Sequence, residues 1–158
     1  MKPFFILLGL SICVMSLSAQ EAYQYNQFYY QRSTLFEKLP IDSDDIVFLG
    51  NSITNGCEWH ELFNNPNIKN RGISSDVSMG VYDRLDPIIK GKPAKIFLMI
   101  GINDIWRQFD TPTIPEQHVY PAEYRENLCE MLERTLPVVK GVILMSPYYM
   151  ELNREDPM

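Results

Sequence analysis

The sequence predicts an α/β fold in which a parallel β-sheet carries helices on both faces. Four short apolar runs, each typical of a strand buried on both faces, are separated by segments whose apolar residues have helical spacing. Strand and helix in alternation is the pattern of βαβ units, whose strands lie parallel. The 158 residues are enough for one domain of this kind.

The first half of the chain contains two expected helices and two expected strands. Apolar residues at helical spacing predict a leading amphipathic helix over residues 25–36, ended by Pro40. The run Ile-Val-Phe-Leu at 46–49 predicts a strand buried on both faces. Apolar residues three and four positions apart predict a short helix at 59–63, and residues 68–71 form a weaker strand candidate.

The second half continues the alternation. Residues 77–89 predict a helix with one member of the pair Ser75-Asp76 as its N-cap. The run at 96–100 is the strongest strand signal in the chain. A helical stripe covers residues 124–136 before a proline, and residues 142–145 supply a fourth strand.

Charge and composition exclude several classes of partner. The chain has 14 Lys and Arg against 20 Asp and Glu, a formal net charge of -6, and no basic run. Nucleic acids and anionic membranes need a basic surface, so neither is expected as a partner. Three cysteines without CxxC spacing make neither a disulfide scaffold nor a zinc site, and no metal is expected. Cys57 and Cys129 could pair in an oxidising compartment, although two half-buried thiols on helices are the commoner arrangement.

The first 19 residues have the features of a secretory signal peptide. Lys2 precedes an apolar run from Phe4 to Met15, and a stretch of small residues follows the run. The run is too short to span a bilayer comfortably, so no stable membrane insertion is expected after cleavage. A lipoprotein signal at Cys13 is a poorer match, because a bulky residue precedes this cysteine. We therefore expect residues 20–158 to form an exported domain that works in the periplasm or outside the cell.

Polar, glycine-containing turns follow the first three expected strands, at the edge of the sheet where such folds bind ligands. Ser52, on a tight strand-to-helix turn, is a candidate nucleophile. The backbone N–H of Gly72 and the side-chain amide of Asn103 are candidate donors to an oxyanion. Simpler roles remain open: Ser52 as a helix N-cap, Gly72 as a residue with positive φ, and Asn103 or Asp104 as the cap of its turn.

These turns resemble the first three sequence blocks of the SGNH hydrolases, also called GDSL-type esterases and lipases. The matching segments are Gly-Asn-Ser-Ile-Thr at 50–54, the glycine at 72 and Gly-Ile-Asn-Asp at 101–104. The resemblance covers about residues 44–146 and implies a three-layer α/β/α sandwich of flavodoxin-like type with no metal or organic cofactor. It also implies that Ser52 is the catalytic nucleophile, and that the Ser52 N–H, Gly72 and Asn103 form the oxyanion hole.

The sequence departs from the family pattern in two places. Asn51 replaces the Asp of the GDSL motif, which we expect to be tolerated because that Asp is not a member of the catalytic triad. The family takes its catalytic Asp and His from an Asp-x-x-His block near the C-terminus, and the 158 residues contain no such block. We therefore expect the chain to be truncated, with the triad Asp and His and the last strand-helix unit missing. Without a base, Ser52 would be a poor nucleophile.

Two histidines are candidates to replace the missing base. His60 directly follows Trp59 on the short helix, away from the ligand-binding edge, and we expect it to be a surface residue. His118 lies in the Pro-rich stretch after Asn103, on the correct side of the sheet. It is a candidate for a substrate contact, with a solvated loop residue as the simpler alternative.

The predicted function is that of an exported serine ester hydrolase that removes short acyl groups. The sequence around the glycine turns is most similar to the platelet-activating-factor acetylhydrolase-like and carbohydrate-acetylesterase-like branches of the family. This similarity implies a small acylated substrate, in particular an acetylated sugar. The alternative is a non-catalytic carbohydrate-binding domain or pseudoenzyme that keeps the fold without the acid-base pair.

Overall fold

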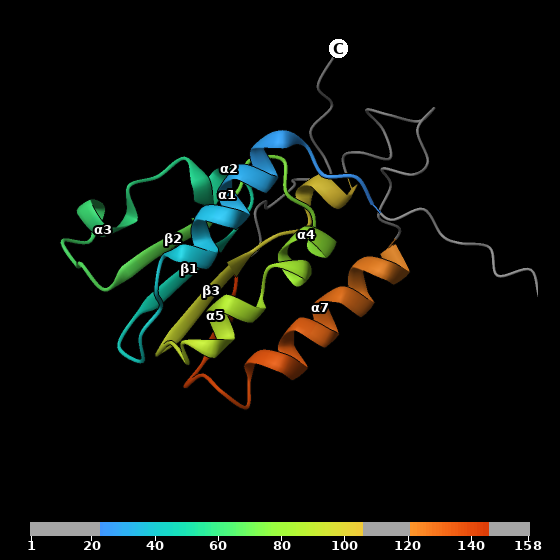
Figure 1. Ribbon diagram of the computed structural model, residues 1–158. Helices are drawn as coiled ribbons and strands as arrows, with labels where there is room; N and C mark the ends of the chain where they lie inside the picture. Colours follow the sequence, from blue (N-terminus) through green and yellow to red (C-terminus); the bar gives the residue numbers. More distant parts are fainter. Residues whose placement is uncertain (1–22, 106–120, 146–158) are drawn as a thin grey trace, which may run out of the picture.

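A parallel four-stranded sheet forms the centre of the protein in the computed structural model, which describes residues 23–105 and 121–145 (Figure 1). The strands are β1 (Ile46–Gly50), β2 (Ile68–Gly72), β3 (Lys95–Met99) and β4 (Val142–Leu144). Their order in the sheet is β2-β1-β3-β4, and every neighbouring pair is parallel. The predicted α/β fold with a parallel sheet is confirmed, and each strand matches its prediction to within a residue at each end.

Helices connect the strands, as the sequence predicts. The labelled helices are α1 (Gln27–Lys38), α2 (Ser52–Asn55), α3 (Trp59–Leu62), α4 (Ser78–Asp83), α5 (Asp86–Lys90) and α7 (Pro121–Thr135). The side chain of Asn26 caps α1 by accepting the Tyr29 N–H at 2.9 Å, and α1 ends before Pro40. Residues 102–105 form one further helical turn after β3.

The single helix predicted over residues 77–89 is wrong, because the structure divides it into α4 and α5. The reason is Pro87, which has no N–H to donate and whose ring would clash with the carbonyl of Asp83 four residues earlier. The expected cap is also wrong. The N-cap of α4 is Val77, which has no capping side chain, and the first helical N–H, that of Ser78, donates instead to the carboxylate of Asp104 at 2.9 Å.

One face of the sheet packs on α4, α5 and α7 (Figure 1). Alternate residues of β1 and β3 face this side, because successive side chains of a strand point to opposite faces. The buried core consists of Ile41, Val47, Leu49, Val81, Leu85, Ile88, Ile96, Leu98, Ile100 and Met131. A smaller buried cluster of Tyr29, Phe36 and Ile73 fixes α1 beside β2. This core holds the strands in place, and with them the turns at their carboxyl ends.

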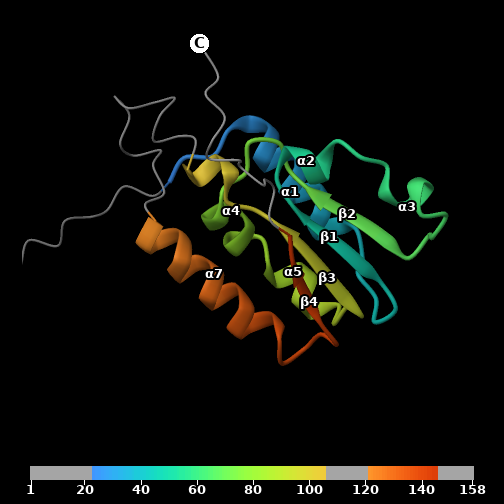
Figure 2. The same ribbon diagram turned by 180° about the vertical axis from the view of Figure 1, so that it is seen from behind.

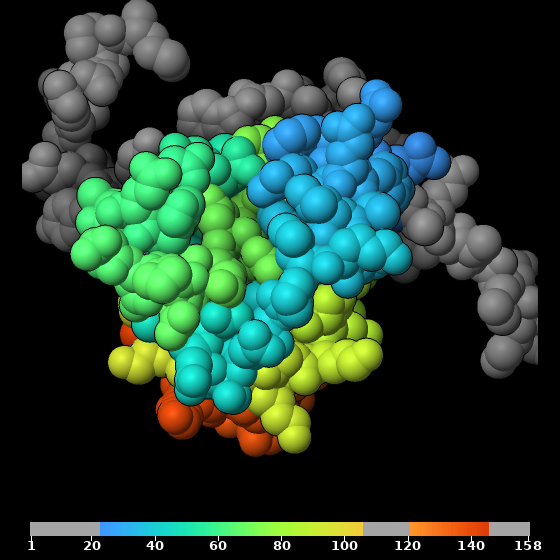
Figure 3. Space-filling view, turned by 60° about the vertical axis from the view of Figure 1, so that its left-hand side comes forward, coloured from blue at the N-terminus to red at the C-terminus, as the bar shows by residue number. Residues whose placement is uncertain are grey.

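The opposite face carries an aromatic stack. Phe48 of β1 stacks with Trp59 of α3 and with Phe97 of β3, with ring centroids 4.6 Å and 4.8 Å apart. Figure 2 shows the molecule from behind, with α4, α5 and α7 on one side of the strands and α3 on the other side, near β2. Helices therefore pack on both faces, as the predicted sandwich requires. In the space-filling view, α1 and the α2–α3 segment form two ridges with a hollow between them (Figure 3).

Among residues 23–105 and 121–145, no helix has the length and apolar character needed to cross a membrane. Cys57 and Cys129 are both free thiols. Cys57 is half-buried but lies in the bend between α2 and α3, and Cys129 lies on α7 but is exposed, so the expectation of two half-buried thiols on helices is wrong. The expected signal peptide lies outside the described residues.

Candidate active site

Three turns meet at one edge of the sheet. Gly50 at the end of β1 lies in register with Gly72 of β2 and with Met99 of β3. The chain therefore leaves all three parallel strands at the same level and on the same side. This edge, which we call the rim, is formed by residues 50–56, 72–77 and 100–105. The structure brings the predicted residues Ser52, Gly72 and Asn103 to the rim together.

Ser52 is the first residue of α2, and its side chain is exposed. The cap of this helix is Asn51, whose side-chain oxygen accepts the Ile53 N–H at 3.0 Å. The simpler role considered for Ser52, that of the N-cap, is therefore wrong. Asn51 is fully buried, and its own N–H donates to Met99 O at 3.3 Å. The neighbour of Ser52 is thus fixed to the end of β3, while the Ser52 hydroxyl stays accessible to a substrate.

Gly72 lies under α2 at the end of β2. A Cβ at this position would lie 2.2 Å from the Asn55 nitrogen and 2.6 Å from the Thr54 carbonyl carbon, far inside contact distance. The positive-φ glycines of the described residues are Gly50 and Gly101, so the positive φ considered for Gly72 is wrong. Glycine is required here because the backbone of α2 approaches so closely. The Gly72 N–H, a predicted oxyanion donor, donates to the Asn70 side chain at 2.8 Å.

Asn70, a residue of β2 two positions before Gly72, is not among the site residues predicted from the sequence. Its amide nitrogen donates to the carbonyls of Thr54 and Cys57, both at 2.9 Å, while its oxygen accepts the Gly72 N–H. One side chain on β2 thereby binds the end of α2, the helix that begins at Ser52. The Asn70 partners lie 13 and 16 positions away in sequence, so no local pattern indicates the contact.

Asn103 lies on the helical turn after β3 and is half-buried. Its side-chain nitrogen donates to the backbone carbonyl of Asp76 at 2.7 Å. An amide NH2 group has two hydrogens, so the same nitrogen has a second hydrogen for another acceptor. The contact fixes the orientation of the amide, which suits it to donate to an oxyanion at the rim.

Asp104 belongs to the core side of the same turn. It is 1% exposed and accepts both the N–H and the hydroxyl of Ser78, while Asn127 of α7 donates to the Ser78 hydroxyl at 3.0 Å. Burial raises the pKa of Asp104 above the usual range, and the hydrogen bonds from Ser78 lower it in part. Asp104 therefore caps α4, not its own turn, and joins the β3 turn to that helix.

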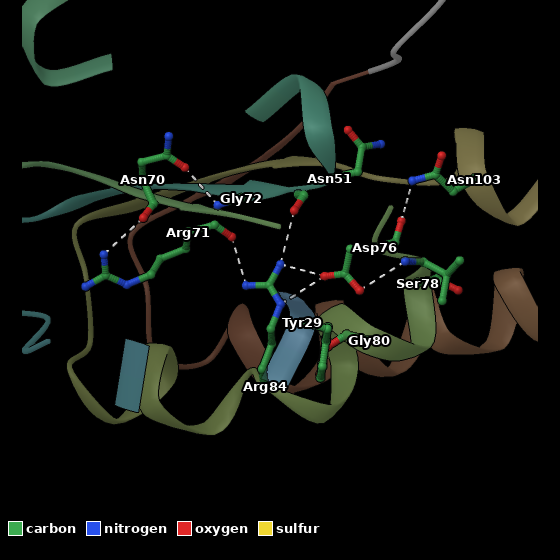
Figure 4. A network of polar contacts seen from close by, with 12 residues as sticks. Tyr29, Asn51, Asn70, Arg71, Gly72, Asp76, Ser78, Gly80, Arg84 and Asn103 are labelled. Atoms are coloured by element: carbon green, nitrogen blue, oxygen red, sulfur yellow. Dashed lines mark hydrogen bonds and ion pairs between the residues drawn. The ribbon is translucent and has the colours of Figure 1, made fainter. Parts of the chain in front are cut away.

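A buried ion pair lies beneath the rim (Figure 4). Arg84, the residue that follows α4, donates from Nε and Nη2 to one carboxylate oxygen of Asp76, at 3.0 Å and 2.8 Å. Its side chain is 5% exposed and that of Asp76 is fully buried. Burial raises the pKa of Asp76 to about 6, while Arg84 and the Val77 N–H act in the opposite direction. The sequence analysis missed Arg84, because nothing in a helical stripe marks an arginine that points into the protein.

The remaining site predictions concern histidines and metals. The His60 side chain is 49% exposed and lies beside Glu58 and Glu61, so its prediction as a surface residue is confirmed. His118 lies outside the described residues. No group of three or more His, Cys, Asp or Glu within residues 23–105 and 121–145 could hold a metal ion. A cavity of about 620 Å³ lies between α1 and the α4–α5 segment, and its lining includes none of Ser52, Gly72 and Asn103.

The rim thus combines an exposed serine at a helix N-terminus with a fixed amide donor and nearby backbone N–H groups. A serine hydroxyl can attack a carbonyl carbon, and amide N–H groups can donate to an oxyanion, so these groups suit acyl transfer. Neither Asp76 nor Asp104 is available as a base, because Arg84 and Ser78 occupy their carboxylates.

Comparisons with known proteins point to one group of enzymes. No protein-family model matches the chain. Over 92 residues it is 45% identical to an acetylxylan esterase of Geobacillus stearothermophilus, a match that covers 58% of this chain but only 42% of that protein. The chain therefore spans less than half the length of this relative.

Solved structures give longer matches. The acetylxylan esterase Axe2 of Geobacillus stearothermophilus superposes with a TM-score of 0.63 at 33% identity, over 75% of this chain and 67% of that one. LAE5, an alpha/beta hydrolase enzyme from the metagenome of Lake Arreo, superposes with a TM-score of 0.62 at 33% identity, over 73% and 65% of the two chains.

Several matched Axe2 structures are described as catalytic mutants, with a Ser, an Asp or a His replaced by Ala. The Asp and the His are three positions apart in that protein, which is the spacing of an Asp-x-x-His block. Sequence identity, superposition and the three turns at the rim agree, and the chain belongs to the SGNH hydrolases, among the carbohydrate-acetylesterase-like members of that family.

Proposed function

We propose that the protein is a serine ester hydrolase that removes acetyl groups from a carbohydrate, with Ser52 as the nucleophile. The observation that carries the proposal is the exposed Ser52 at the start of α2, on the same rim as the fixed amide of Asn103. An acetylated xylo-oligosaccharide is the proposed substrate class, because the relative and the Axe2 structures are described as acetylxylan or acetyl-xylooligosaccharide esterases.

In the proposed reaction, the Ser52 hydroxyl oxygen forms a bond to the acetyl carbon, and a base takes the hydroxyl proton. The carbonyl oxygen becomes an oxyanion that accepts hydrogen bonds from the Ser52 N–H, the Asn103 amide and a backbone N–H of the turn at residues 72–75. The carbon–oxygen bond to the sugar then breaks, and the sugar oxygen receives the proton. Water attacks the acetyl-serine in the same way, releasing acetate and restoring the serine.

The Gly72 N–H can act in this oxyanion hole only if the intermediate displaces Asn70 from it, because that N–H already donates to the Asn70 side chain. The proposed base is the His of an Asp-x-x-His pair, as the family resemblance implies. The 158 residues contain no such pair, so the reaction should be measured on the native protein and on the 158-residue chain in parallel.

The first test is the intact mass of the native protein after treatment with a fluorophosphonate, which adds covalently to activated serines. We expect one adduct, which maps to Ser52, and loss of the adduct in Ser52→Ala. Acetate release from acetylated xylo-oligosaccharides should fall at least about a thousandfold in the same variant. Ser33→Ala is the matched control, because Ser33 is a serine on α1 whose hydroxyl donates to Tyr30 O, away from the rim. Equal activity of Ser52→Ala and wild type would refute the proposal.

The competing function is carbohydrate binding without catalysis. One observation favours it: His60 is the sole histidine among residues 23–105 and 121–145, and it lies on α3, away from the rim. This function predicts no fluorophosphonate adduct on the native protein, together with measurable binding of xylo-oligosaccharides in calorimetry. An adduct on Ser52 would exclude it.

Export of the protein is part of the proposal and is supported by Lys2 and the apolar run after it. N-terminal sequencing of the native protein tests this point. A first residue near position 20 is expected, and a native protein that still begins at Met1 would contradict export through a cleaved signal.

A further inference from the structure

The guanidinium of Arg84 contacts the end of β1, the end of β2 and the turn after β2 at once (Figure 4). Nη1 donates to the backbone carbonyl of Arg71 at 2.8 Å, and Nη2 donates to the backbone carbonyl of Gly50 at 3.1 Å. Nε and Nη2 also donate to the carboxylate of Asp76. Arg84 is 7% exposed, so these contacts are made within the protein and away from solvent.

Each of the three contacts lies next to a group of the proposed oxyanion hole. Gly50 stands two residues before Ser52 at the end of β1. Arg71 directly precedes Gly72 at the end of β2. Asp76 provides the backbone carbonyl that holds the Asn103 amide. A single side chain therefore links the nucleophile turn, the β2 turn and the segment that orients Asn103.

Arginine suits this position for geometric reasons. Its planar guanidinium has five N–H donors in fixed directions, so it can bind two carbonyls and a carboxylate together. A lysine would keep the charge, but its single nitrogen cannot reach three acceptors in the same geometry. The Asp76 carboxylate compensates for the charge of Arg84, which would otherwise be costly to bury.

We propose that Arg84 is a positioning residue of the active site, which acts through Gly50, Arg71 and Asp76 to hold the Ser52 and Asn103 donors at the distance that an oxyanion requires. The proposal rests on the proposed esterase function and deepens it. Displacement of catalytic groups by about 1 Å can cost about a hundredfold in rate. Because Arg84 is buried and so out of reach of a bound sugar, replacing it should affect the chemical step and not substrate binding.

The test is Arg84→Lys in the native protein, assayed for acetate release from acetylated xylo-oligosaccharides. We expect kcat to fall about tenfold to a hundredfold while KM stays within about twofold of wild type. Arg134→Lys is the matched control. Arg134 lies on α7, where it forms an ion pair with Asp86 and covers the ring of Tyr82 on α4. This variant therefore changes an arginine without touching the rim. Its kcat should stay at the wild-type value.

A second measurement does not depend on activity. In the 158-residue chain, the 1H–15N NMR signals of the Ser52 N–H and of the Asn103 side-chain amide should shift in Arg84→Lys and stay in place in Arg134→Lys. If the wild type lacks the Ser52 adduct, the esterase proposal fails, while these signals still test the positioning role. If Arg84→Lys does not fold, Asp76→Asn is measured in the same way, because it removes the charge that Arg84 binds.

Three outcomes would overturn the proposal. The first is an active Arg84→Lys enzyme with wild-type kcat. The second is a variant whose KM rises while kcat is unchanged, which would place Arg84 in substrate binding. The third is unchanged Ser52 and Asn103 signals in a folded variant, or failure of both variants to fold, which would make Arg84 a residue of general stability.

Discussion

Replacing Gly72 with alanine tests whether the close approach of β2 and α2 sets the position of the nucleophile. The new Cβ would lie 2.2 Å from the Asn55 nitrogen, and ordinary contact begins at 3.4 Å. The two backbones would have to separate by about 1.2 Å. The obstacle is backbone and not a flexible side chain, so rotation of a side chain cannot relieve it.

The separation has two expected consequences. Overpacking of this kind costs about 1–3 kcal/mol of folding free energy. If α2 moves, Ser52 at its start moves by a similar distance relative to the Asn103 amide, and a displacement near 1 Å can lower kcat about a hundredfold. We therefore expect Gly72→Ala to be folded and to have a large loss of kcat.

Urea unfolding gives the stability, and acetate release by the native protein gives kcat. Gly141→Ala is the matched control, because a Cβ at Gly141 has no atom within 4 Å. It should match wild type in both measurements. A folded Gly72→Ala enzyme with kcat within about twofold of wild type would refute the reasoning. It would mean that the edge strand β2 moves and α2 does not.

Three further predictions concern stability. Leu85→Ala removes a fully buried core side chain and should lower the unfolding free energy by about 2–5 kcal/mol in urea, whereas a loss below about 1 kcal/mol would contradict the core described above. In Asn70→Asp, an oxygen replaces the nitrogen that donates to two carbonyls of the α2 segment, and this oxygen repels them. The free energy of unfolding should fall by about 1–3 kcal/mol in the same assay. Burial raises the pKa of Asp76 to about 6, against about 3.9 in the unfolded chain. The contribution of Asp76 to the free energy of unfolding is therefore most favourable below pH 4 and is lost as the pH rises towards 6. Urea unfolding at several pH values should therefore show that the free energy of unfolding falls less between pH 4 and 6 in Asp76→Asn than in wild type. An equal fall in both proteins would show that Asp76 has an ordinary pKa.

The positions and boundaries of the strands along the chain could be predicted because they depend on local composition. A run such as Ile-Val-Phe-Leu at 46–49 has no polar face, so only a position between two packed layers suits it. The break between α4 and α5 was missed for a related reason. The apolar residues at 77, 81, 85 and 88 keep helical spacing across the break, so periodicity alone cannot detect it, although Pro87 is a direct signal of the interruption.

The location of the catalytic candidates at one edge of the sheet could be predicted, because Ser52 and Asn103 lie in turns after strands and Gly72 ends β2. The residues that hold these turns in place could not be predicted. Apart from the hydrogen bond from Gly72 to Asn70, the contacts of Asn70 and Arg84 described above join positions 8 to 34 residues apart. The identity of an asparagine or arginine does not reveal its partner. Asn103 and Asp104 illustrate the limit. They are neighbours in one turn, yet Asn103 binds the Asp76 carbonyl beside the rim while Asp104 caps α4 in the interior. Which of two adjacent polar residues faces the substrate is decided by the helix packed behind the turn, here α4. A substitution in that helix should therefore alter catalysis even though it contacts no substrate.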